Sequence, residues 1–176
     1  MAKLRKMLGA ADSPYIVSLM GLIETQSKVT IAKWCMDYCE EHILPIYEKH
    51  CPGDMRPRSA ITAARDWFED RRKLPEVRQI ILKDCHAAAR ELDSNPAAQA
   101  AARACGQASA CFHTPTHSLG LAFYGAAAIA YDRVGIAERP ELYDQIAAEV
   151  CAKMEAALRL VAVENEPNPA RINWNC

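Results

Sequence analysis

Only seven of the 176 residues are glycine, and the sequence lacks the stretches of alternating Val, Ile and Thr that are typical of β-strands. Alanine is abundant instead, and it is the strongest helix former. A chain with few glycines, many alanines and no strand pattern does not favour a sheet. We therefore expect an all-α fold without a β-sheet.

The sequence also lacks a long apolar run and an excess of charge of either sign. No stretch approaches the ~20 apolar residues that span a bilayer, and residues 9–14 would interrupt the apolar part of a signal peptide. The formal net charge is only -1, which gives no overall field toward nucleic acid or an anionic membrane. We therefore expect a cytoplasmic protein that binds neither nucleic acid nor a membrane, and whose eight cysteines stay reduced.

Prolines and capping residues divide the chain into helices. Apolar residues recur at helical spacing within each expected segment. The expected helices cover residues 14–26, 27–44, 57–71, 75–92, 96–112, 114–133 and 140–161. Pro45 should kink or end the second helix near Leu44. Residues 96–134 are open to two interpretations, one kinked helix or two.

Short links between these helices make successive helices antiparallel neighbours. We therefore expect one domain, 1–176, built as a bundle of six or seven helices, with an N-terminal arm (1–12) and an irregular C-terminal tail (164–176). Small residues at 97–110 and 120–130 allow close backbone contact and predict a central helical hairpin. Ile172 and Trp174 are large apolar residues, so we expect the tail to be ordered, on its own bundle or on a second copy in a homodimer.

His113 and His117 are four residues apart, a spacing that on a helix places two metal ligands on one face. However, Pro115 lies between them, and no Glu follows the first histidine as in zinc proteases. Cys35 and Cys39 share the same spacing, but the chain has no Cys-x-x-Cys pair. We therefore expect no metal and no cofactor, with the two cysteines packed in the core.

Arg103 and Gln107 are four residues apart on the alanine-rich helix and should line one surface. Together with His113 or His117 and Tyr124, they would give a pocket several convergent polar groups. Asp84 lies next to the apolar stripe of its helix. A carboxylate there would need an arginine partner such as Arg65, Arg90 or Arg103.

Four segments of the sequence resemble bacterial immunity proteins with an Imm-5-like domain. These are residues 53–67, which contain Arg-Pro-Arg and Trp67, and residues 86–90, 101–108 and 113–124, the last with His-x-x-x-His. Residues 168–174 are also similar to a subgroup of them. The resemblance implies an all-helical intracellular protein that binds and neutralises a toxin, and it supplies no catalytic residues.

The leading hypothesis is therefore a non-enzymatic helical protein that neutralises a protein toxin by direct binding. The alternative is a helical ligand-binding or catalytic domain with a polar pocket. The candidate pocket residues are Arg58, Asp66, Trp67, His86, Arg103, Gln107, His113, His117 and Tyr124. The two hypotheses differ in whether His113, His117 and Arg103 converge in a pocket or scatter over the surface.

Overall fold

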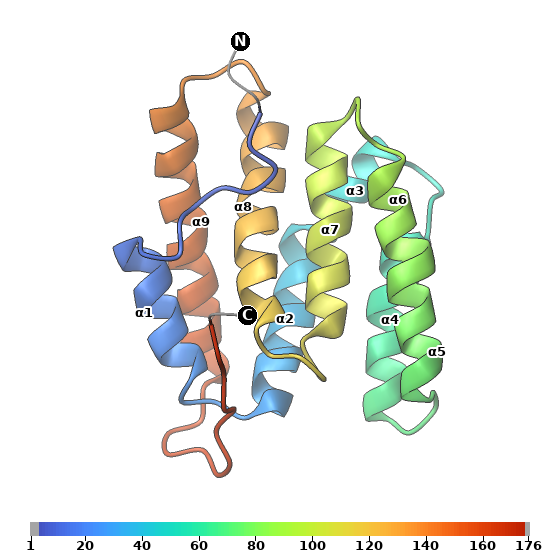
Figure 1. The fold of residues 1–176 in the computed structure, drawn as a ribbon, viewed down its shortest axis with the longest axis vertical. Coiled ribbons are helices and arrows are strands. Elements are labelled where there is room, and N and C mark those ends of the chain that lie inside the picture. The colour runs from blue at the N-terminus through green and yellow to red at the C-terminus, as the bar shows by residue number, and fades with distance from the viewer. Residues whose placement is uncertain (1–3, 175–176) are drawn as a thin grey trace.

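The helices of a computed structural model, which describes residues 4–174, stand side by side around one central helix (Figure 1). The elements are α1 (Pro14–Ile23), α2 (Lys28–His42), α3 (Leu44–His50), α4 (Arg56–Phe68), α5 (Leu74–Gln79), the π-helical segment η1 (Ile80–Cys85), α6 (His86–Arg90), α7 (Pro96–Ala110), α8 (His117–Val134) and α9 (Pro140–Val161). No strand occurs among the described residues, so the predicted all-α fold is confirmed.

Proline positions explain most helix boundaries. α2 ends at His42 and α3 begins at Leu44, because Pro45 has no N–H to continue the hydrogen-bond ladder. α5, η1 and α6 follow one another without a break and form one helix from 74 to 90. If α2 and α3 are also counted as one helix kinked near Pro45, the described chain forms seven helical rods, within the predicted six or seven.

The central hairpin consists of two separate helices. α7 begins at Pro96, behind the N-cap Asn95, whose side chain accepts a 3.1 Å hydrogen bond from the Ala98 N–H. It ends at Ala110, and α8 starts only at His117, after a turn that contains Thr114 and Pro115. The question that the sequence left open is thereby answered in favour of two helices.

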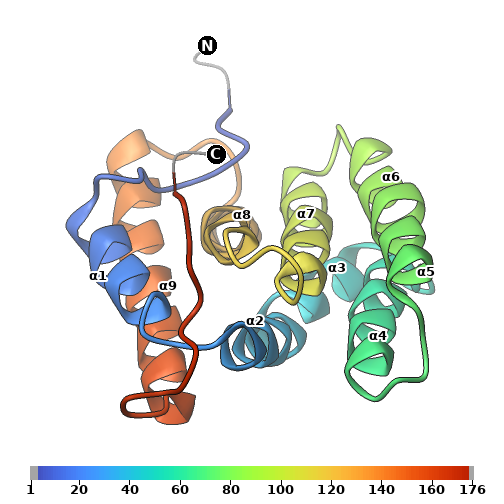
Figure 2. The same ribbon diagram turned by 60° about the horizontal axis from the view of Figure 1, so that its bottom comes forward.

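The core is centred on α7. This helix packs against α2, α3, α4, α6 and α8, and Figure 2 shows it standing between α8 and α6, above α2. Its buried positions are mostly alanine, as the sequence predicted, which lets the surrounding helices approach closely. One side of α7 is left uncovered, and this side carries the candidate site.

The C-terminal tail folds back onto the turn between α1 and α2. The Ala170 N–H donates a 2.8 Å hydrogen bond to the Gln26 carbonyl, and Ile172 and Trp174 pack against the core. The Trp174 indole N–H also donates to the Glu24 carboxylate. The expected ordered, irregular tail is thus found on its own bundle through residue 174.

Two further expectations from the sequence are settled by side-chain placement. Asp84 is exposed and forms no ion pair in the described chain, so the expected buried ion pair was wrong. Arg65 pairs instead with Glu40 and Asp37. In the part of the chain described, no helix is long and apolar enough to cross a membrane.

Candidate functional site

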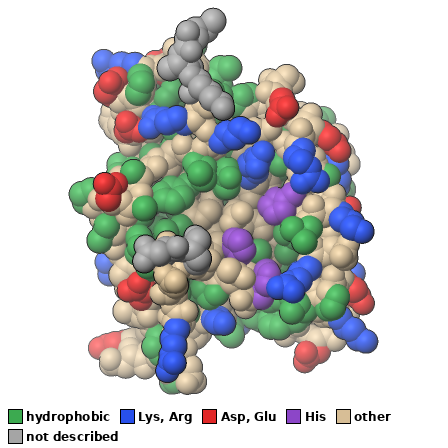
Figure 3. All heavy atoms as spheres, in the orientation of Figure 1, with side chains coloured by type: hydrophobic (Ala, Val, Ile, Leu, Met, Phe, Trp, Pro, Cys, Tyr) green, Lys and Arg blue, Asp and Glu red, His purple; other side chains and the backbone are tan. Residues whose placement is uncertain are grey.

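Three histidines from three different segments line one pocket on the uncovered side of α7. His86 begins α6, His113 lies in the turn after α7, and His117 begins α8. The pocket has a volume of about 400 Å³, and Gln107 and Gly106 form part of its wall. Figure 3 shows histidine side chains close together on this face, with lysine and arginine side chains next to them.

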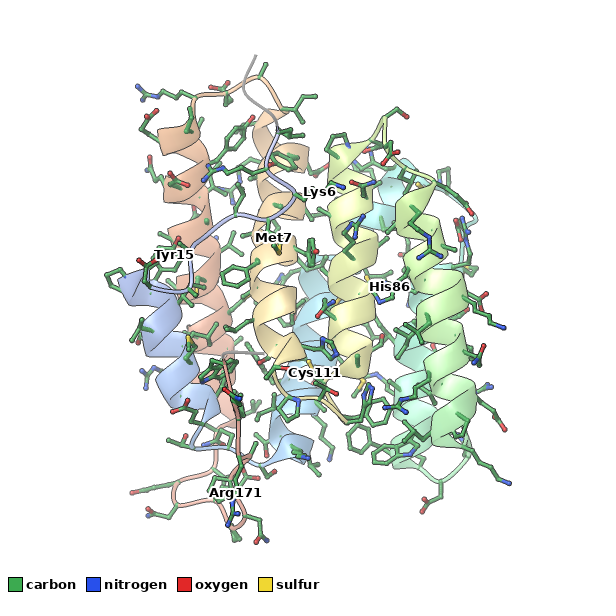
Figure 4. All side chains as sticks on the ribbon, viewed as in Figure 1. Lys6, Met7, Tyr15, His86, Cys111 and Arg171 are labelled. Carbon is green, nitrogen blue, oxygen red and sulfur yellow. The ribbon has the colours of Figure 1, made fainter. Side chains whose placement is uncertain are left out.

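Two glycines make room for the polar side chains of the pocket. A Cβ atom at Gly106 would lie 2.6 Å from Cε1 of His86, too close for any carbon pair. A Cβ atom at Gly120 of α8 would overlap the side-chain amide of Gln107. Figure 4 accordingly shows the His86 side chain between α6 and α7. Glycine destabilises a helix by ~1 kcal/mol relative to alanine. At both positions this loss of helix stability is accompanied by room for a polar side chain of the pocket.

Gln107 fixes the orientation of His117. Nδ1 of His117 lies 2.7 Å from Oε1 of Gln107, so the ring N–H donates to the amide oxygen. The second ring nitrogen, Nε2, is then the one left to bind a ligand. The hydrogen bond therefore fixes the tautomer of His117 and leaves the Nε2 edge of the ring available.

The π-helical segment η1 forms the apolar wall of the pocket. Ile81 and Leu82 belong to η1 and line the pocket together with Ala110. Leu82 is 58% exposed, so its side chain is accessible to a ligand in the pocket. π-helical turns inside α-helices occur frequently at functional sites. Here the segment ends immediately before His86, so it sets the side of the helix on which that histidine lies.

The cations around the pocket lack acidic partners. Arg58, Arg65 and most other arginines form ion pairs, whereas Arg78, Arg90 and Arg103 form none within residues 4–174. The Arg103 guanidinium instead lies 5.8 Å from the ring centroid of Tyr124. Within residues 4–174, Nε of Arg103 and Nδ1 of His113 are buried without a hydrogen-bond partner, which costs free energy at this place in the fold.

The surroundings keep all three histidines neutral near pH 7. Burial lowers the pKa of His86, and the positive charges of Arg103 and Arg90 lower it further. Burial also lowers the pKa of His113, with Arg78 acting in the same direction. The pKa of His117 is lowered by burial and then by the two other histidines. No carboxylate is among the groups that act on these rings, so the pocket is electropositive.

The structure brings together four of the nine residues that the sequence singled out. His86, Gln107, His113 and His117 line the pocket itself. Arg103 lies one turn of α7 before Gln107 and lines a neighbouring hollow of about 230 Å³, which also includes Lys6 and Tyr131. Tyr124 adjoins this region through its contact with Arg103.

The remaining three candidates lie away from the pocket. The Trp67 ring packs 4.5 Å from Phe112, which in turn contacts His113, so Trp67 supports the pocket from behind. Arg58 forms an ion pair with Glu48 at 2.6 Å. Asp66 pairs with Arg71 at 2.7 Å, on the far end of α4.

Sequence reasoning missed several residues of the pocket. Arg78, Ile81 and Leu82 look like ordinary helix-surface or core positions in the sequence, and nothing in the sequence predicts a π-helical turn there. Gly106 did carry a signal, because a glycine within an alanine-rich helix indicates close approach of another group.

The cysteines and histidines are not arranged as a metal centre. Between residues 4 and 174, no group of three or more His, Cys, Asp or Glu side chains could hold a metal ion. Cys35 and Cys39 are buried in the core of α2, and the Cys39 thiol lies 3.5 Å from that of Cys105. The seven described cysteines are free thiols, and Cys176 lies outside the described residues.

The fold and the site together define an all-helical protein with an electropositive face on its central helix. The sequence model of one family, described as "Imm-5 like putative immunity protein", matches residues 21–157. The chain belongs to this family, as its resemblance in residues 53–134 predicted. Comparison with curated proteins and with solved structures gives no match.

Proposed function

We propose that this protein neutralises a protein toxin by binding it directly through the uncovered face of α7. Membership of an immunity family supports the class of partner. The observation that supports the location is the group of arginines without ion pairs, Arg78, Arg90 and Arg103, beside three histidines. Elsewhere on the molecule, most arginines already have acidic partners.

The charge of this face sets the chemistry of the toxin. The chain carries 21 basic and 22 acidic residues, so its overall field is close to neutral. In Figure 3, however, the basic side chains gather around the histidines, and the acidic ones lie toward the edges of the view. Complementary potentials raise association rates and suppress wrong partners. We therefore expect the toxin to present an acidic surface to α7.

The experiment that tests this proposal is a protection assay. Candidate toxin domains are expressed singly, with and without the protein, and cell survival is measured. We expect the protein to protect against one of them and to co-purify with it. Arg78→Glu should abolish both protection and co-purification.

Lys33→Glu is the matched control, because Lys33 is also an exposed helical cation that forms no ion pair within residues 4–174. It lies on α2, which stands behind α7 and α8 in Figure 1. This variant should protect as the wild type does. Loss of protection by both variants, or by neither, would contradict the proposed face.

The convergence of His86, Gln107, His113 and His117 also favours a second candidate, a ligand-binding or catalytic domain. Such polar convergence in a concave site is typical of small-molecule sites. Among the described residues, no serine, cysteine or carboxylate lines the pocket, so its histidines are the groups that would bind a ligand or transfer a proton.

A further inference from the structure

The histidine pocket is lined by both polar and apolar side chains. His86, His113 and His117 supply ring nitrogens, and Ile81, Leu82 and Ala110 supply apolar surface. Arg78 stands at the rim, exposed and without an ion pair in the described chain. The volume of the pocket, about 400 Å³, lies within the range of small-molecule sites and exceeds the volume of a bare oxyanion.

We propose that this pocket binds a small organic anion, with its oxyanion group against the histidines and Arg78 and its apolar body against Leu82 and Ile81. The oxyanion is a phosphate or a carboxylate, which present the same hydrogen-bond acceptors to these donors. This inference goes beyond toxin binding and does not rest on it, because the pocket holds the anion whether or not a toxin is bound.

The charges around the pocket favour an anion over a metal cation. Arg103 and Arg90 act on His86, and Arg78 and Lys28 act on His113, all through positive charge. A divalent cation placed between these rings would be repelled by every one of them, and no carboxylate is present to offset this. An oxyanion at the same place gains from each cation, and it favours the protonated form of each ring, which donates a hydrogen bond to it.

Three features indicate that the pocket is built rather than accidental. Gly106 and Gly120 leave the space into which His86 and Gln107 are pressed. Gln107 holds the His117 ring in one orientation through a 2.7 Å hydrogen bond. Nδ1 of His113, one of the pocket residues, is buried without a hydrogen-bond partner in the described chain. A surface hollow with no ligand would not need polar side chains held in this way.

The experiment measures the binding of phenyl phosphate, used as the probe, to the full chain by isothermal titration calorimetry. We expect saturable binding with one site per chain. Inorganic phosphate should bind more weakly, because it buries no apolar surface, and phenol should not bind, because it lacks the charge. Benzoate distinguishes a carboxylate from a phosphate site by its affinity relative to phenyl phosphate.

Two variants test the location. Arg78→Gln should weaken phenyl phosphate binding about tenfold, the expected loss of one charge-assisted contact. Gly106→Ala should displace the His86 ring and weaken binding by at least as much. If Gly106→Ala fails to fold, Arg78→Gln decides alone, because Arg78 is exposed. His42→Asn is the control, since His42 lies at the end of α2, outside the pocket.

A second readout is the nuclear magnetic resonance of the histidine Cε1 protons. Phenyl phosphate should shift the signals of His86, His113 and His117 and leave those of His42 and His50 in place. Absence of saturable binding, equal binding of phenol, or equal shifts at all five histidines would overturn the proposal. None of these outcomes would bear on the toxin, whose binding is measured separately by protection and co-purification.

Discussion

Glu166 should be one of the strongest anchors of the C-terminal tail. Its carboxylate accepts hydrogen bonds from the Ser27 N–H at 2.6 Å, the Ser27 hydroxyl at 2.7 Å and the Thr30 hydroxyl at 2.6 Å. Ser27 is the N-cap of α2, so the negative charge also lies at the positive end of that helix dipole. Glu166→Ala removes all of these interactions at once.

The expected loss follows from these contacts. A hydrogen bond to a charged group contributes ~1.5–3 kcal/mol when buried, and a charge at a helix terminus ~0.3–1 kcal/mol. The three bonds share one carboxylate that is only partly buried, and water can replace it at Ser27 and Thr30. We therefore expect Glu166→Ala to lower the free energy of unfolding by about 2 kcal/mol in total. For a chain of this size, that lowers Tm by about 4–8 °C.

The assay is thermal unfolding followed by circular dichroism. Glu164→Ala serves as the control, because Glu164 is an exposed carboxylate two residues earlier that makes no contact in the described structure. Burial alone would raise the pKa of Glu166, but the hydrogen bonds from Thr30 and Ser27 outweigh it and lower that pKa. The wild type should therefore keep its advantage at pH 7 and lose it as the pH falls through this lowered pKa. A Tm within 1 °C of the control would refute the reasoning.

Three further predictions concern the pocket and the thiols. The pKa values of His86, His113 and His117 are lowered in the folded protein, so the unfolded chain binds more protons below about pH 6.5 and the free energy of unfolding should fall from pH 7 to pH 5. In denaturant titrations, a variant with all three changed to Asn should show a smaller fall, and the same fall as in the wild type would contradict this. Gly120→Ala should displace the Gln107 side chain and shift the His117 Cε1 proton signal; an unshifted signal would show that Gln107 does not hold the ring. Tm should change little, because the gain in helix propensity, ~1 kcal/mol, offsets the loss of one hydrogen bond. Cys51 should be alkylated first among the seven described cysteines, because the other six are buried. Mass spectrometry of the labelled native protein measures this, and equal labelling of Cys85, whose pKa is raised by burial, would contradict the described packing.

Much of the fold was predictable because it depends on local signals. Pro14, Pro96 and Pro140 lie at the helix starts that the sequence predicted, whereas Pro45 was expected to kink or end a helix and in fact also lies at the start of α3. The alanine-rich segment 97–110 also identified the central helix, since only small side chains let several helices pack around one. Helix ends were less certain, and α1 ends three residues earlier than expected, at Ile23.

The site was predictable only in part, because it depends on tertiary packing. His113, His117 and Gln107 are close in sequence and share one hairpin, so their proximity could be inferred. His86 reaches them through the packing of α6 on α7, which periodicity does not reveal. The π-helical turn before His86 shifts the helix register, and therefore Leu82 and Arg78 were not expected at the pocket. Arg58 and Asp66 were grouped with the pocket, although local ion pairs hold them elsewhere.

The central claim is that the uncovered face of α7 binds the toxin, and amide hydrogen exchange of the purified complex tests it most directly. We expect slower exchange on toxin binding in the turn at 111–116, in α6 and at the start of α8, around His86, His113 and His117. The exposed side of α9, on the other side of α8 from α7, should exchange as it does in the free protein. Protection confined to α9 or α1, with no change around the histidines, would contradict the claim.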